Sequence, residues 1–474
     1  LFWEGIQSYT RALKDKSVET LDLRRSLERV TGKNLELFFN QWTERAGHPV
    51  LKVKLARDAV RGFLSVTITQ TQAGPAYAFP AELLFRFGTR EVRHTLDVVA
   101  KSERFVLPES EAPSYFRFDP REAVLLKEVT VEKGRGLWIE QLRAGDLVGR
   151  IRAARHLAKE RRPEGLAALR AALDKDPAWS VRLEIARAMA GVSGKVARVA
   201  LLGALADRDA QVRRAAAEGL ASHGVDSVVA EALAARLKAG DPSYYVEAAC
   251  VGAYGAVCAE PRELLVAALG RESHNDVIRQ AALDALSGLD DPSLVSLFAR
   301  YTGGRTRGRT RTKAIRCLSV AGLPGATPEQ LKQVLAALGP LLRSESTWVR
   351  QAALDTLKAL GAASRPLLAE VNRVAAQDAQ DSVRKRAEEV ATAIRAGAPP
   401  SEQLKRLEAA RKRFETDRKA LEGRIDKLES EMRARRKPPT KPPTKPPAKK
   451  KPAPKPAKKN PKQTSSPGAE RGVF

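Results

Sequence analysis

The sequence predicts a multidomain, mostly α-helical protein that contains one small antiparallel β-sandwich and a long α-solenoid. Three observations predict this class. A helical pattern recurs every 31 to 39 residues through the middle of the chain, strand-like alternation fills the stretch before it, and a Lys/Pro-rich segment closes the chain. The 474 residues are long enough for several domains with buried cores.

Residues 1–47 are predicted to be helical. Apolar residues recur at helical spacing until Gly32 interrupts the pattern. Asn34 then provides a suitable N-cap for another helix. That helix is expected to bury three aromatic side chains: Phe38, Phe39 and Trp42.

Residues 48–135 have the period of two that β-strands require. Leu64, Val66 and Ile68, for example, alternate with polar residues, and glycine and proline punctuate such runs. The segment 124–133 is expected to supply the last strand. Short strands at this spacing predict a small antiparallel β-sandwich.

Residues 137–396 contain about eight copies of one helical unit. The four clearest copies have a β-branched residue, then an arginine, then alanines and an apolar residue seven positions after the arginine, with the arginine at Arg182, Arg213, Arg279 and Arg350. Weaker copies fall at Arg150, Arg311 and Arg384, and one unit has Glu247 instead. These units resemble HEAT repeats of the short bacterial type, in which stacked helix pairs share a continuous core.

The repeated arginine is expected to be structural. An aspartate often precedes it, as Asp176, Asp209, Asp276 and Asp381 do. We predict a ladder in which the arginines bond to turns or to neighbouring units, formed by Arg150, Arg182, Arg213, Arg279, Arg350 and Arg384. The alternative is a nucleic-acid-binding stripe, and recurrence with the structural repeat favours the ladder.

Residues 401–436 follow a heptad pattern that predicts a long helix. Two arginines at core-type positions, Arg411 and Arg418, weaken a coiled-coil interpretation. Two alternatives therefore stay open: a self-associating coiled coil, or a single helix that is solvated or docks on the end of the solenoid.

Residues 437–474 are predicted to form a disordered, Lys/Pro-rich basic tail. The chain carries a formal net charge of +27, and the acid-free stretch 433–462 supplies 13 of those charges. Such a tail can contact nucleic acid or another polyanion without sequence preference, and the candidate contacts are Lys449, Lys450, Lys451, Lys458 and Lys459. The alternative is a solubilising tail without a dedicated partner.

No catalytic or cofactor-binding motif is present in the sequence, so no catalytic, cofactor-binding or metal-binding residue is assigned. The five histidines lie at least 46 positions apart, which excludes an HExxH zinc motif. Neither a P-loop nor a GxSxG elbow occurs. The Gly/Arg-rich stretch 302–313 is interpreted as an inter-repeat loop, with phosphate contact as the alternative.

Cysteine usage and hydropathy give few constraints. Cys250, Cys258 and Cys317 form no CxxC pair and are expected to fill small apolar sites. No apolar run approaches the length of a membrane span. The cellular compartment is left open.

The first part of the chain resembles the end of the catalytic domain in gluzincin zinc aminopeptidases, the family of alanyl aminopeptidase and leukotriene hydrolase. The similarity lies in VETLDLRRSLERVTG (18–32), LELFFNQW (35–42), GHPVLKV (47–53) and YFRFDPREAVLLKEVT (115–130). In that family such a segment leads from a helical lobe into a β-sandwich. The resemblance implies that residues 1–47 are the last helices of a truncated catalytic domain, fused here to a HEAT-repeat solenoid.

The resemblance also implies where the chemistry lies. A parent protein would carry HExxH, a later glutamate ligand, zinc and a tyrosine near the transition state, all before the matched segment. The chain itself is therefore expected to be inactive, with zinc in the missing N-terminal domain. In this interpretation the parent removes N-terminal residues from peptides, and the solenoid is an accessory or protein-interaction module.

Two other functions are weighed against this one. The first is a non-catalytic HEAT-repeat scaffold on an aminopeptidase-like body, with a basic tail that contacts polyanions. The second is a nucleic-acid-associated protein that acts through its basic tail and loops.

Overall fold

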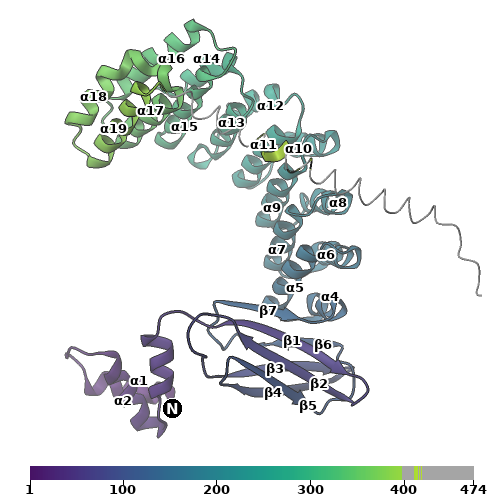
Figure 1. The fold of residues 1–474 in the computed structure, drawn as a ribbon. Coiled ribbons are helices and arrows are strands. Elements are labelled where there is room, and N and C mark those ends of the chain that lie inside the picture. The colour runs from purple at the N-terminus through teal and green to yellow at the C-terminus, as the bar shows by residue number, and fades with distance from the viewer. Residues whose placement is uncertain (398–409, 411, 415, 417, 419–474) are drawn as a thin grey trace, which may run out of the picture. The chain divides into compact units, whose positions relative to one another are not determined.

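The computed structural model describes residues 1–397 together with residues 410, 412–414, 416 and 418. The chain divides into two compact units, Leu1–Leu404 and Lys405–Phe474, and almost all described residues belong to the first. Most of the predicted heptad helix (401–436) and the whole predicted tail (437–474), including its five candidate lysines, lie outside the described residues. The described part confirms a mostly helical chain with small β-sheets and repeated helix pairs (Figure 1).

The chain begins with short helices. These are α1 (Phe2–Ala12), α2 (Thr20–Thr31), α3 (Glu36–Phe39) and a π-helical turn, η1 (Asn40–Glu44). Glu19 and Asp22 form a capping box at the start of α2, and Gly32 ends α2 with a positive φ of 67°. Phe39 is buried, but Phe38 is 54% exposed. The prediction that Phe38 lies in a core was wrong, because α3 has only four residues and presents one side to the interior.

Seven strands follow and form two sheets. They are β1 (Val50–Asp58), β2 (Phe63–Gln70), β3 (Phe79–Phe87), β4 (Arg90–Val98), β5 (Ser102–Leu107), β6 (Tyr115–Phe118) and β7 (Glu128–Glu132). One sheet has the order β5-β2-β1-β7 and the other β4-β3-β6. Buried side chains from both sheets form one core that includes Val53, Val66, Phe85 and Phe116.

The sequence predicted a fully antiparallel sandwich, and this prediction was wrong for one pair of strands. β7 pairs with β1 in parallel, with Val53 opposite Val131. The reason lies in the path of the chain. The intervening strands return the chain to the start of β1, where the Lys127 amide donates a 3.0 Å hydrogen bond to the Pro49 carbonyl. β7 therefore runs in the same direction as β1, and the sandwich itself forms the long crossover connection.

Helix pairs then stack along the rest of the described chain (Figure 1). The first row holds α5 (Leu147–Glu160), α7 (Trp179–Ala190), α9 (Ala210–Leu220), α11 (Tyr244–Val257), α13 (Val277–Ser287), α15 (Gly308–Cys317), α17 (Thr347–Leu360) and α19 (Asp381–Arg395). The second row holds α4 (Arg135–Ala144), α6 (Pro163–Lys175), α8 (Lys195–Ala204), α10 (Ser227–Ala239), α12 (Arg262–Ala268), α14 (Val295–Ala299), α16 (Pro328–Leu341) and α18 (Leu368–Gln377).

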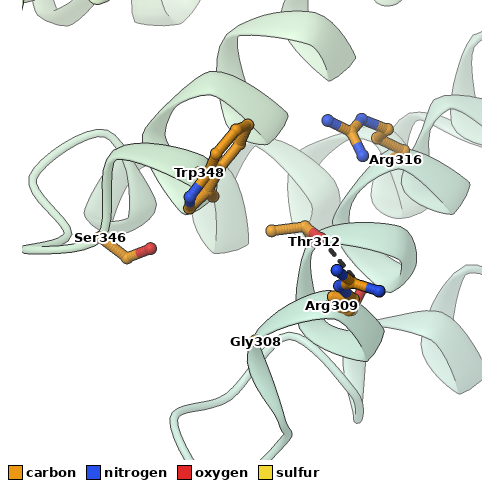
Figure 2. A pocket seen from close by; sticks show the side chains of 6 residues that line it. All are labelled: Gly308, Arg309, Thr312, Arg316, Ser346 and Trp348. Carbon is orange, nitrogen blue, oxygen red and sulfur yellow. Dashed lines mark hydrogen bonds between the residues drawn. The ribbon is translucent and has the colours of Figure 1, made fainter. Parts of the chain in front are cut away.

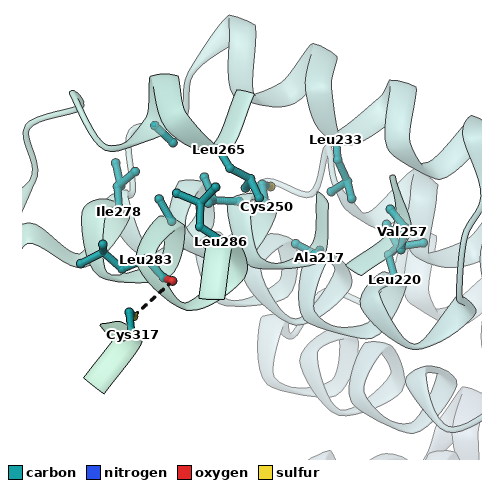
Figure 3. Packing of buried hydrophobic residues seen from close by; sticks show 14 of the residues in the cluster. Ala217, Leu220, Leu233, Cys250, Val257, Leu265, Ile278, Leu283, Leu286 and Cys317 are labelled. Carbon is teal, nitrogen blue, oxygen red and sulfur yellow. Dashed lines mark hydrogen bonds between the residues drawn. The ribbon is translucent and has the colours of Figure 1, made fainter. Parts of the chain in front are cut away.

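Consecutive helices of the first row contact each other from α5 to α19. A single cluster of buried apolar side chains extends from Trp138 to Ile394, and Figure 3 shows its middle part, with Cys250 and Leu286 among the labelled residues. No unit could bury its apolar face alone, so the stack itself is the core. Among the described residues, no helix has both the length and the hydropathy of a membrane span.

Small residues let helices of adjacent units approach closely. A Cβ added at Gly255 of α11 would lie 2.8 Å from the Cβ of Ala285 in α13. By contrast, a Cβ added at Gly252 of the same helix would meet no atom within 4 Å. Gly255 therefore sits at a contact between helices, whereas Gly252 does not.

Candidate binding surface of the solenoid

The repeated arginines lie on the first row of helices, and four of them bind an acid of the next unit. Arg182 is the clearest example, because its side chain is only 3% exposed. Its Nε and Nη2 donate to the two carboxylate oxygens of Asp207, at 2.7 and 2.9 Å. Its Nη1 donates to the Asp176 carbonyl at 2.7 Å, in the turn of its own unit. One guanidinium thus ties two consecutive units together.

We call each such pair a rung. Four rungs share this bidentate geometry: Arg150–Asp176, Arg182–Asp207, Arg213–Asp241 and Arg350–Asp378. The partner acid follows its arginine by 25 to 28 residues. Asp209, which had been noted as a preceding acid, instead caps α9 by accepting from the Gln211 amide.

The middle of the solenoid departs from this rule. Glu247 occupies the arginine position, and its carboxylate pairs with Arg271 at 2.7 Å, so this rung has its charges reversed. Arg279 has no acid of the next unit; it pairs with Asp276 of its own unit at 2.9 Å. Arg384 donates to the Asp378 carbonyl at 2.7 Å and pairs with Asp381.

These contacts decide what the repeated arginines can do. The six predicted ladder arginines all donate to carboxylates or carbonyls inside the solenoid. A guanidinium held in this way is not free to bind a phosphate, because breaking a buried pair leaves an uncompensated charge. Arg150, Arg182, Arg213 and Arg350 bind aspartates of the next unit, whereas the contacts of Arg279 and Arg384 stay within their own units.

An open cavity lies farther along the solenoid, between α15 and α17. It has a volume of about 520 Å³ and is lined by Gly308, Arg309, Thr312, Arg316, Ser346 and Trp348. Figure 2 shows the Trp348 ring on α17 facing the α15 side chains across this space. Trp348 is 71% exposed, which is unusual for the largest apolar side chain. We call this the α15–α17 cavity.

Residues 302–313 had been interpreted as an inter-repeat loop, and this interpretation was wrong for residues 308–313. Residues 302–307 are irregular, but α15 begins at Gly308, so residues 308–313 are helical. The helix forms because Thr310, Ala314 and Ile315 face the core of the solenoid and are fully buried. Packing overrides the weak helix propensity of the glycine and threonines.

A buried lysine joins the sandwich to the solenoid. Lys133 Nζ donates to the Phe116 carbonyl at 2.6 Å and to Gln141 Oε1 at 2.5 Å, and it lies over the Trp138 ring. Burial lowers the pKa of Lys133 well below its ordinary value, and the charge of Arg117 lowers it further. Phe116 belongs to β6 and Gln141 to α4, so Lys133 connects the sandwich with the first helix of the solenoid.

The described residues show no metal site and no activated thiol at Cys250 or Cys317. No group of three or more His, Cys, Asp or Glu side chains in this part of the chain is arranged to hold a metal ion. The cysteines are free thiols. Burial raises the pKa of both Cys250 and Cys317 to about 12, which suits inert core residues rather than nucleophiles.

Comparison with known proteins identifies the repeats. Residues 137–222, which hold the first units of the solenoid, match the family model of HEAT repeats. No curated protein matches the chain.

Among solved structures, the chain is similar to aminopeptidase A of Legionella pneumophila in complex with aspartic acid, with 12% sequence identity and a TM-score of 0.45. The similarity covers 82% of this chain and 54% of that one, so the chain spans about half the length of that protein. A likeness of this degree establishes neither activity nor substrate.

Proposed function

We propose that this chain is the C-terminal part of a zinc-aminopeptidase-like protein and that its HEAT solenoid binds protein or peptide partners. The observation that carries the binding role is the open α15–α17 cavity on a solenoid whose repeated arginines are all engaged internally. The resemblance of residues 18–53 and 115–130 to gluzincin aminopeptidases supports the parentage. Peptide hydrolysis would belong to residues outside this chain.

The first helices give further support. Phe2 and Trp3 on α1 and Leu37 and Phe38 on α3 are each more than half exposed. Exposed aromatic and aliphatic groups of this size are typical of a surface that packs against another part of a protein. Helices at the end of a larger catalytic lobe would have such a surface.

The described part of the chain has no cluster of three ligands that would fit zinc. In the proposal, zinc belongs to the preceding lobe, where it would polarise the scissile carbonyl and activate water.

Extending the coding sequence upstream of Leu1 tests this proposal. We expect it to encode HExxH and a later glutamate ligand. If the upstream sequence encodes other residues at those ligand positions, the non-catalytic scaffold is supported instead. A start codon directly before Leu1, with no peptidase lobe, would refute the parentage.

The chain as given provides a second test. We expect no stoichiometric zinc by elemental analysis and no hydrolysis of aminoacyl anilides. Hydrolysis by the purified chain that persists when the chain is purified by a second, independent procedure would show that it contains a catalytic site.

A polyanion-binding role for the tail is a second candidate function, carried by the 13 positive charges and absence of acids in residues 433–462. Binding of duplex DNA by the full chain and by a chain ending at Arg436 should be compared across a salt series. If the chain that ends at Arg436 no longer binds DNA, the binding belongs to the tail. Persistence of a steep salt dependence would assign it to the solenoid.

A further inference from the structure

We infer that the α15–α17 cavity binds an acidic peptide segment that inserts one apolar side chain beside Trp348. This inference rests on the proposed peptide-binding role of the solenoid, and it names the chemistry of the partner. Three features of the cavity carry it: unpaired positive charge at its edge, an exposed indole ring in it, and room for one side chain.

The charge comes from a stretch without acids, residues 292–328, which we call the basic segment. It contains six arginines and one lysine: Arg300, Arg305, Arg307, Arg309, Arg311, Lys313 and Arg316. Most solenoid arginines described above are paired. In the basic segment Arg311 donates to the Thr302 carbonyl, Lys313 pairs with Asp284 and Arg316 lies 3.4 Å from Asp355.

Four arginines of this segment differ from the rest. The side chains of Arg300, Arg305, Arg307 and Arg309 form no ion pair or hydrogen bond with any residue that the structure describes. Arg309 also lines the cavity. Unpaired guanidinium groups beside a cavity favour a carboxylate-bearing ligand, to which they can donate bidentate hydrogen bonds.

The apolar part of the site comes from α17. Trp348 lies in the first turn of this helix, and its ring borders the cavity opposite Thr312 (Figure 2). The volume of about 520 Å³ lies within the range of ordinary ligand pockets. A tryptophan beside a pocket, flanked by arginine, is the combination that most often dominates peptide and protein binding.

The acidic side chains near the α15–α17 cavity do not neutralise the arginines at its edge. Asp355 of α17 is shared between Arg316 and Arg386, so its charge is compensated. Glu345 is an exposed acid in the turn that precedes the lining residue Ser346, but it does not line the cavity. The edge of the cavity therefore keeps a net positive charge.

The same features favour a peptide over a nucleic acid. A single-stranded nucleic acid needs several aromatic faces in succession and a long track of cations. Trp348 is the only aromatic residue in the cavity lining, and only one of the unpaired arginines belongs to that lining. A concave site for one side chain with a few cations at its edge suits an acidic peptide better.

The test uses the full chain and a fluorescein-labelled, blocked peptide of Glu and Asp residues with one central Leu. We expect saturable binding, measured by anisotropy, that weakens as salt is raised from about 50 to 300 mM. Trp348→Ala should weaken it about tenfold, and Arg309→Ala about threefold. The same peptide with Ser in place of Leu should bind about tenfold more weakly.

Matched controls come from an earlier unit. Trp179, 43% exposed, lies in the first turn of α7 as Trp348 lies in the first turn of α17, and Arg170 is an exposed arginine of α6. Trp179→Ala and Arg170→Ala should leave affinity within about twofold of the unmodified chain. Circular dichroism melting should show that all four variants fold, since each changed side chain is on the surface or partly exposed.

Several results would overturn the inference. These are the absence of saturable binding, equal weakening by Trp348→Ala and Trp179→Ala, and equal affinity for the Leu and Ser peptides. Tighter, Trp348-dependent binding of oligothymidylate would replace the peptide by a nucleic acid. None of these results depends on whether a zinc-binding lobe is encoded upstream, so failure of the inference and failure of the proposed parentage can be told apart.

Discussion

Replacing Arg213 by alanine should test whether the rungs hold the solenoid together. The Arg213–Asp241 rung is the most enclosed of the four, with side chains 10% and 0% exposed. Arg213 donates to both carboxylate oxygens of Asp241 at 2.8 Å and to the Asp207 carbonyl at 2.8 Å. The substitution removes all these bonds at once and leaves the Asp241 carboxylate buried.

The structure sets the size of the effect. Breaking a buried ion pair from one side costs about 3–5 kcal/mol. Asp241 keeps two other partners, the Arg236 guanidinium and the Ser243 amide, so we expect the lower end, about 3 kcal/mol. Arg214, the next residue, is 50% exposed and pairs with Glu218 one turn away. Arg214→Ala should therefore cost only about 0.5 kcal/mol.

The pH dependence should reveal the same rung. Burial raises the pKa of Asp241, but hydrogen bonds from Arg213, the Ser243 amide and Arg236 outweigh burial and lower it from 3.8 to about 2. The resulting stabilisation, about 2 kcal/mol, is present above pH 3.8 and is lost as the pH falls toward 2. In the Arg213→Ala variant the pKa of Asp241 moves back up, so the two proteins should converge in stability at low pH.

The assay is urea unfolding of the full chain followed by circular dichroism of the helices. Solenoids can unfold in parts, so the informative quantity is the difference between Arg213→Ala and Arg214→Ala rather than an absolute free energy. Equal midpoints for the two variants, or an Arg213→Ala penalty that does not shrink between pH 5 and 2, would show that the rung does not stabilise the fold.

Two further predictions concern the contacts between units. Gly255→Ala should destabilise the chain by about 1 kcal/mol, because the new Cβ would lie 2.8 Å from the Cβ of Ala285 and this clash outweighs the better helix propensity of alanine. Gly252→Ala has room for its Cβ and should stabilise the chain by about 0.5–1 kcal/mol. Melting temperatures that shift in the same direction for both variants would contradict this prediction. Glu247→Arg should cost about 2 kcal/mol by facing Arg271 with a like charge, and adding Arg271→Asp should restore at least half, as a double-mutant cycle would measure.

The repeat unit was readable from the sequence because it is local. Three features of the sequence predict the first-row helices: a repeat of about one helix pair, the alanines, and the β-branched residue before most of the arginines. Residues 137–222 also match the family model of HEAT repeats. The partner acids were harder to choose. Asp207 and Asp209 are near neighbours, and only the packing of α7 on α9 determines that Asp207 faces Arg182 while Asp209 caps its own helix. Sequence spacing alone does not distinguish these two roles.

The α15–α17 cavity shows the other limit of sequence analysis. Its basic character was visible in the acid-free stretch, but the stretch appeared to be a loop because glycine and threonine are weak helix formers. Trp348 lies more than 30 residues farther along and had no local signal of exposure. Only stacking of consecutive units brings α17 against α15, so that the indole and Arg309 line the same cavity. Arg182 and Arg309 have the same side chain, and their surroundings separate them. The carboxylate of Asp207 engages Arg182, whereas the side chain of Arg309 forms no ion pair or hydrogen bond with the described residues.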